Sequence, residues 1–143
     1  MILLDANVLL YAYHPRAEQH ERCRSWVEST LSGAELVGIP WMTIQAFLRI
    51  ATNPRAFEHP LSIDEASEIV SAWLALPAVV QVEPGERYWD ILQKLLRAGQ
   101  VAGPLVPDAA LAALALEHGA ILCTTDRDFT RFAGVRLLTP LAD

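Results

Sequence analysis

Short apolar segments and amphipathic segments alternate along the whole chain. Five apolar runs have the length of strands and are bounded by turn residues: about 2–5, 36–39, 79–82, 120–124 and 136–138. Five further segments carry apolar residues at three- and four-residue spacing and predict helices: about 18–31, 42–52, 63–76, 86–98 and 109–118. This alternation is typical of one α/β domain, here over residues 1–143, around a mostly parallel sheet of about five strands.

Capping and breaking residues mark several expected helix ends. Ser62 followed by Glu65 is a capping-box pattern, which predicts a helix start near residue 63. Gly33 and Gly99 stand where two of the helical patterns stop, and glycine is common just past a helix end. These signals support the helical assignments independently of the apolar spacing.

The composition is that of a globular protein. Hydrophobic residues make up 52% of the chain and charged residues 20%, so a packed core is expected and disorder is not. No apolar run approaches the roughly 18 to 20 residues needed to cross a bilayer, and the first residues lack the basic segment of a signal peptide. Cys23 and Cys123 both lie in apolar patterns, which predicts buried thiols and a reducing, cytoplasmic location.

The net charge of −6 is unfavourable for contact with a nucleic acid. Lys94 is the single lysine, so affinity for a polyanion would depend on a few arginines and on bound cations. Candidates for such contacts are Arg49, Arg55, Arg127 and Arg131. The acidic balance also favours a cationic partner that could cover an acidic site.

Three aspartates stand where apolar elements begin or end. Asp5 closes the first strand, Asp126 follows the strand near 120–124, and Asp108 precedes the helical run that starts at Ala109. If the strands are parallel neighbours, their carboxyl ends share one edge of the sheet, where open α/β sheets bind ligands. Clustered carboxylates repel one another unless a cation neutralises them, and oxygen donors favour Mg²⁺ or Mn²⁺. A divalent-metal site is therefore predicted.

Each acid also has a purely structural interpretation. Asp108 could serve as a helix N-cap, and Asp126 and Asp128 could cap a turn or face water. Asp5 is harder to explain in this way, because a carboxylate at the end of a central strand is costly unless it is paired or metal-bound. The four histidines and two cysteines have no zinc-ligand spacing, so a zinc site is not expected.

The motifs together resemble those of the PIN-domain ribonucleases, and most closely the VapC-type toxins of bacterial toxin–antitoxin pairs. The resemblance covers nearly the whole chain and rests on Asp5-x-Asn7, Pro107-Asp108, Thr124-x-Asp126-x-Asp128 and the 46–55 segment AFLRIATNPR. It implies a three-layer α/β/α sandwich and a metal-dependent endoribonuclease. It further implies a homodimer and a cognate antitoxin that blocks the site.

The resemblance also implies roles for individual residues. Asp5, Asp108 and Asp126 match the metal-ligating acids, and Asp128 matches a further acid near the metal. Asn7 and Thr124 match polar residues that orient the first acid, the water or the phosphate. Arg49 and Arg127 are candidates for substrate contact, although a structural ion pair is an equally good interpretation of Arg127.

One position departs from the family pattern. Many PIN domains carry a glutamate on the helix after the second strand, and the alignment of this helix puts Gln45 in its place. Glutamine keeps an oxygen for coordination but brings no charge. Either the aspartates are sufficient to hold the cation, or the site binds a second ion poorly.

Two rival classes remain to be weighed. A phosphoaspartate enzyme or receiver domain would also place an aspartate after its first strand, but Asn7 stands where the dehalogenase type needs a second acid, and Lys94 falls in mid-helix. The other rival is a PIN-like module that binds RNA or protein through a weakened, inactive metal site, which the Gln45 departure favours.

Overall fold

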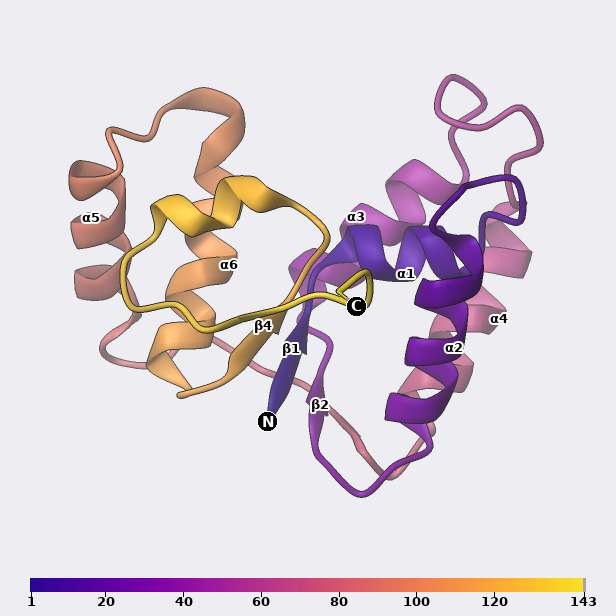
Figure 1. Ribbon diagram of the computed structural model, residues 1–143, viewed down its shortest axis with the longest axis horizontal. Coiled ribbons are helices and arrows are strands. Elements are labelled where there is room, and N and C mark those ends of the chain that lie inside the picture. The colour runs from indigo at the N-terminus through magenta and orange to yellow at the C-terminus, as the bar shows by residue number, and fades with distance from the viewer. Residues whose placement is uncertain (143) are drawn as a thin grey trace.

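Five parallel strands form one sheet in the order β3-β2-β1-β4-β5, so that β1 lies at its centre (Figure 1). The computed structural model describes residues 1–142. The strands are short: β1 (Ile2–Leu4), β2 (Val37–Gly38), β3 (Val79–Val80), β4 (Ile121–Cys123) and β5 (Leu137–Leu138). All five lie within the segments that the apolar pattern predicted, and the prediction of a mostly parallel, about five-stranded sheet is confirmed.

Helices cover both faces of this sheet. The α-helices are α1 (Ala6–Ala12), α2 (His20–Leu31), α3 (Trp41–Ala51), α4 (Ile63–Leu74), α5 (Tyr88–Ala98) and α6 (Val106–Glu117). Two 3₁₀ helices, η1 (Gly103–Leu105) and η2 (Arg127–Arg131), precede α6 and follow β4. In Figure 1, α1 to α4 lie on one side of the strands, whereas α5 and α6 lie on the other. The predicted α/β/α sandwich is therefore confirmed.

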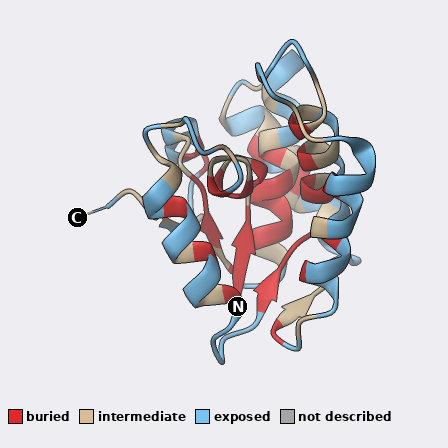
Figure 2. Ribbon diagram, turned by 90° about the vertical axis from the view of Figure 1, so that its right-hand side faces the viewer, coloured by how far each residue is buried: buried red, intermediate tan, exposed pale blue. Residues whose placement is uncertain are grey.

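The core is divided by the sheet into two apolar clusters. Along β1, Ile2 and Leu4 join the cluster under α1 to α4, whereas Leu3 joins the cluster under α6. On β4 the same alternation sends Cys123 to the first cluster and Leu122 to the second. Figure 2 shows the central strands buried and the outer faces of the helices exposed. Strands buried on both faces explain why they appear in the sequence as continuous apolar runs.

Two differences from the predicted helices affect the residues around the acids. Residues 6–12 form α1, which was not predicted, and Asp5 caps it by accepting a hydrogen bond from the Ala6 N–H at 2.7 Å. The last helix begins at Val106, three residues before the predicted start at Ala109, because Pro107 is compatible with the first turn of a helix. Asp108 therefore lies inside the first turn and is not the N-cap. By contrast, the capping box at Ser62 is present.

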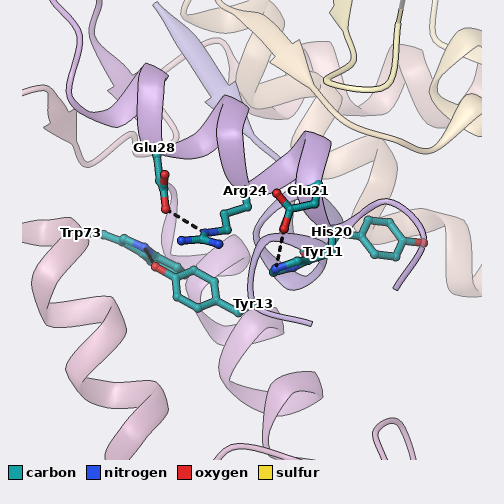
Figure 3. Close-up of polar contacts among 7 residues, drawn as sticks. All are labelled: Tyr11, Tyr13, His20, Glu21, Arg24, Glu28 and Trp73. Carbon is teal, nitrogen blue, oxygen red and sulfur yellow. Dashed lines mark hydrogen bonds and ion pairs between the residues drawn. The ribbon is translucent and has the colours of Figure 1, made fainter. Parts of the chain in front are cut away.

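Contacts of tyrosine, histidine and tryptophan side chains connect the end of α1 to its neighbours (Figure 3). The His20 ring, at the start of α2, contacts the Tyr11 carbonyl oxygen through Nδ1 at 2.9 Å. Trp73 of α4 donates its indole N–H to the Tyr13 hydroxyl at 3.2 Å. These contacts fix α1 relative to α2 and α4, and α1 carries the residues that follow Asp5.

Both cysteines are buried free thiols, as predicted. Trp73 and Phe129 belong to the core, whereas Trp41 and Trp89 are 47% and 59% exposed on the outer surface. Within residues 1–142, none of the helices combines the length and apolar character required to traverse a bilayer.

Candidate active site at the carboxyl edge of the sheet

The three predicted acids face one pocket at the carboxyl edge of the sheet. β1 and β4 pair in parallel with Leu4 opposite Cys123, so Asp5 and the segment leading to Asp126 leave the sheet side by side. Asp108 approaches from the first turn of α6. Asp5, Asp108 and Asp126 all line a pocket of about 310 Å³. This is the edge between oppositely directed crossovers at which doubly wound sheets bind their ligands.

Asp5 is held by hydrogen bonds to both of its carboxylate oxygens. Oδ1 accepts from the Ala6 N–H, while Oδ2 accepts from the Thr124 hydroxyl at 2.8 Å and the Asn7 side-chain amide at 3.1 Å. Burial raises the pKa of Asp5, the nearby Asp126 charge acts in the same direction, and the three donors oppose the rise. The donors therefore orient this carboxylate and favour its charged form.

Asn7 and Thr124 link the ends of the two central strands. The Asn7 amide donates to the Thr124 hydroxyl oxygen at 3.2 Å, and its carbonyl oxygen accepts from the Thr125 N–H at 3.1 Å. Thr124, which is buried, also accepts from the Asp126 N–H at 3.0 Å. Asp126 in turn caps η2 by accepting from the Asp128 N–H at 2.8 Å. One continuous network thus sets the positions of Asp5 and Asp126.

Asp108 is held differently. Within residues 1–142 its carboxylate makes no hydrogen bond and no ion pair, and it is only partly buried. Burial, together with the charges of Asp5, Asp126 and Asp128, raises the pKa of Asp108 to about 6, against which Arg131 acts weakly. The carboxylates are therefore close enough to repel one another. Asp128 lies exposed on η2 and contributes to this negative field.

Helix α3 supplies the opposite wall of the pocket, and it does not present Gln45 to the acids. Gln45 is exposed and is not a lining residue, whereas Ala46 faces the pocket. The buried Thr43 hydroxyl donates to the Leu4 carbonyl oxygen at 2.8 Å and fixes this helix against the end of β1. The α3 wall therefore presents the Ala46 methyl group to the pocket and no carboxylate.

The predicted basic residues fall in different places. Arg49, in the last turn of α3, lines the acid pocket. Arg127 lines a separate cavity of about 320 Å³, which shares Asp126 with the acid pocket. Within residues 1–142, Arg127 forms no ion pair with Asp126 or Asp128, so the structural interpretation of this residue is not supported. Arg55 is exposed in the loop after α3.

The donors in the acid pocket suit a hard divalent cation. They are carboxylate oxygens, and neither histidine nor cysteine lines the pocket. Within residues 1–142, no three Asp, Glu, His or Cys side chains are already arranged to hold a metal ion. The acids would therefore supply part of the coordination, with water or substrate phosphate providing the rest, as is usual for Mg²⁺.

The sequence matches the PIN domain family over residues 2–135, and the chain belongs to that family. Its relatives include two proteins of Mycobacterium tuberculosis. Ribonuclease VapC37 is 44% identical over 142 residues, covering 99% of each chain. Ribonuclease VapC31 is 41% identical over 140 residues, covering 98% of this chain and 99% of the relative. The resemblance to VapC-type PIN domains inferred from the motifs is confirmed.

Solved structures of the same fold are also similar to this chain. The VapBC2 complex of Rickettsia felis, bound to a DNA fragment from its promoter, gives a TM-score of 0.67 at 16% identity and covers 97% of this chain and 98% of that one. Mycobacterium tuberculosis VapC20, a toxin that cleaves the sarcin–ricin loop, gives a TM-score of 0.66 at 16% identity, with 95% and 99% covered. At such identities the likeness establishes the fold.

Proposed function

We propose that this protein is a metal-dependent endoribonuclease that acts as the toxin of a toxin–antitoxin pair. The observation that carries the proposal is the convergence of Asp5, Asp108 and Asp126 on one pocket, in a chain that is 44% identical to a VapC ribonuclease over almost its full length. Three carboxylates that repel one another beside an exposed arginine form a site suited to a cation and a phosphate.

The proposed roles follow from the surroundings of each side chain. Asp5, Asp108 and Asp126 would hold Mg²⁺, with Mn²⁺ as a substitute, and Asp128 would add negative charge nearby. When bound, the cation would activate water and stabilise negative charge on the phosphate. Asn7 and Thr124 keep the Asp5 carboxylate oriented, which is how residues behind a metal ligand tune a site. Arg49, on the pocket wall, would contact the RNA backbone.

The partners that we propose are an antitoxin and a second copy of this chain. An antitoxin is supported by the toxin–antitoxin complexes among the structures of the same fold, and a cationic antitoxin segment would complement a chain with net charge −6. Trp41, exposed on α3, is available for a homodimer contact. Both the RNA substrate and the antitoxin would place the protein in the cytoplasm.

A second candidate is a PIN-like module that binds RNA or protein without cutting it. The observation that favours it is Ala46, because a methyl group lies where another carboxylate would strengthen cation binding. The two candidates differ in one measurable property: the module would bind RNA tightly and leave it intact in the presence of Mg²⁺ or Mn²⁺.

The test compares the purified wild-type protein with Asp5→Asn and Asp108→Asn variants on structured RNAs, with Mg²⁺, with Mn²⁺ and with a chelator. Asp90→Asn is the matched control, since Asp90 is exposed on α5 outside the pocket. We expect metal-dependent cleavage by the wild type and the control, and its loss in both site variants with unchanged circular dichroism. Full cleavage by both site variants would contradict the assignment. Binding without cleavage by the wild type would favour the module.

A further inference from the structure

A second cavity adjoins the acid pocket on the other side of Asp126. It has a volume of about 320 Å³ and is walled by the end of β4, η2, β5 and the segment that follows β5. Asp126 is the one residue that lines both cavities within residues 1–142. A nucleotide chain with a phosphate at the acids would therefore have a neighbouring unit at the mouth of this second cavity.

The guanidinium of Arg127 is available in this cavity. Arg127 is exposed, and within residues 1–142 its side chain donates to no carboxylate and no carbonyl, although Asp126 and Asp128 flank it in sequence. Some exposed arginines are engaged, such as Arg16 with Glu58 at 2.8 Å and Arg24 with Glu28 at 3.0 Å, whereas Arg49, Arg55, Arg97 and Arg131, like Arg127, have no such side-chain partner within residues 1–142. Arg127 differs from these in lining the second cavity. An arginine that lines a cavity without a protein partner presents several N–H donors to a ligand.

The remaining walls combine apolar surface with hydroxyl groups. Leu138 and Leu141 contribute half-buried aliphatic surface. The Thr130 hydroxyl donates to the Arg127 carbonyl oxygen at 2.8 Å, so its lone pairs remain free to accept. The Thr139 hydroxyl oxygen accepts from the Leu141 N–H at 3.2 Å, and among the described residues its proton has no acceptor. Apolar surface with donors and acceptors at its rim matches a flat heterocycle whose edge carries hydrogen-bonding groups.

We propose that this cavity, lined by Arg127, Thr130, Leu138, Thr139 and Leu141, is a nucleotide subsite that binds one base of the RNA beside the cleaved bond. The inference rests on the proposed ribonuclease function and deepens it, because it assigns a source of sequence preference. RNA is favoured over a protein segment for two reasons. The cavity shares Asp126 with the acid pocket, and Arg127 among its lining residues is a cation that can contact a phosphate or a base of the RNA. The bases of an unpaired RNA segment can be splayed out into such a cavity.

The first test measures cleavage of RNA with randomised positions by the wild type, Arg127→Ala and Arg127→Lys. Arg97→Ala is the matched control, because Arg97 is an exposed arginine of α5 that lines neither cavity. We expect Arg127→Ala to lose the base preference at one position next to the cut and to lower kcat/KM for the preferred RNA about tenfold, with preferences elsewhere unchanged. Cleavage lowered equally for all sequences, or not lowered at all, would overturn the subsite.

The second test does not depend on cleavage. The four ribonucleoside 5′-monophosphates are titrated into isotope-labelled protein with Mg²⁺, and backbone amide shifts are followed at Thr125, Thr130 and Thr139. We expect shifts at these amides that differ among the four bases and that disappear in Arg127→Ala but persist in Arg97→Ala. Shifts confined to residues around the acid pocket would overturn the subsite while leaving the nuclease intact. If the shifts occur but the wild type cuts no RNA, the ribonuclease proposal fails and base binding stands.

Discussion

Replacing Asp108 with asparagine should change how the stability of the metal-free protein depends on pH. In the folded chain, burial and the charges of Asp5, Asp126 and Asp128 raise the pKa of Asp108 from its ordinary value of 3.8 to about 6. Above this range the carboxylate is charged in the folded and in the unfolded chain. Its burial and the neighbouring negative charges in the folded chain then lower the free energy of unfolding. As the pH falls from about 6 toward 3.8, the folded chain binds a proton that the unfolded chain does not, so this penalty is relieved.

The size of the effect follows from the same pKa difference. If it were fully felt, a change from 3.8 to about 6 would correspond to about 3 kcal/mol. Asp108 is only partly buried, so solvent screening reduces the expected gain to about 1 kcal/mol. For a chain of this length, a gain of that size raises the melting temperature by roughly 3 °C. The Asn variant should lack this gain.

The assay is thermal or urea unfolding of both proteins, with chelator present, at about pH 7 and about pH 4, where most of the proton uptake by the folded chain is complete. Each protein is compared with itself, so the pH-independent consequences of the substitution cancel. The measurement is then repeated with Mn²⁺. Mn²⁺ should stabilise the wild type more at the higher pH, because the cation binds the charged carboxylate, and should stabilise the Asn variant little. Equal pH dependence in the two metal-free proteins would refute the electrostatic reasoning, and equal stabilisation by Mn²⁺ would refute Asp108 as a ligand.

Three other substitutions test separate parts of the site and sheet. Thr124→Val removes the donor to Asp5 without changing shape; we expect a loss of about 1–2 kcal/mol in unfolding free energy and at least about tenfold slower cleavage, and full activity would show that the network is dispensable. Ala46→Glu adds a carboxylate to the pocket wall, so calorimetry should show tighter Mn²⁺ binding, and thermal unfolding should show that the metal-free variant is less stable than the wild type. An unchanged Mn²⁺ affinity would mean that this position does not reach the cation. Gly38→Ala would bring a Cβ to 2.6 Å from Val82 Cγ2, so we expect about 1–3 kcal/mol of destabilisation; an unchanged melting temperature would contradict such close packing.

The order of strands and helices was predictable because the sheet is buried on both faces. Strands such as Ile121–Cys123 are then apolar throughout and stand out between amphipathic helices. Helix α1 was missed for a physical reason. Asp5 is both its N-cap and a site acid, and seven residues directly after a strand contain too few turns to display a helical period. The strand ends were also set by pairing: β3 stops at Val80 because its partner β2 stops at Gly38.

The candidate site was predictable only as far as its residues lie at element ends. Asp5 and Asp126 follow paired strands, so their meeting in one pocket required only that β1 and β4 be parallel neighbours. Whether Gln45 lines the pocket depended on the rotation of α3, which is set by tertiary contacts such as the Thr43 hydrogen bond to the Leu4 carbonyl oxygen. The cavity around Arg127 could not be foreseen, since it forms from segments that are brought together only when the chain after β5 returns to η2.

Two of the three acids in the pocket are held by hydrogen bonds and the third is not, and this difference affects how a cation would be bound. Asp5 and Asp126 are fixed by the Asn7–Thr124 network, which exists without any ligand. Within residues 1–142, Asp108 has no hydrogen-bonding partner and experiences the repulsion of the other acids. A cation would relieve that repulsion and give Asp108 its first strong partner, so its binding should order the first turn of α6 more than the end of β1. The same repulsion destabilises the metal-free protein, and the free energy released on neutralising it contributes to cation affinity.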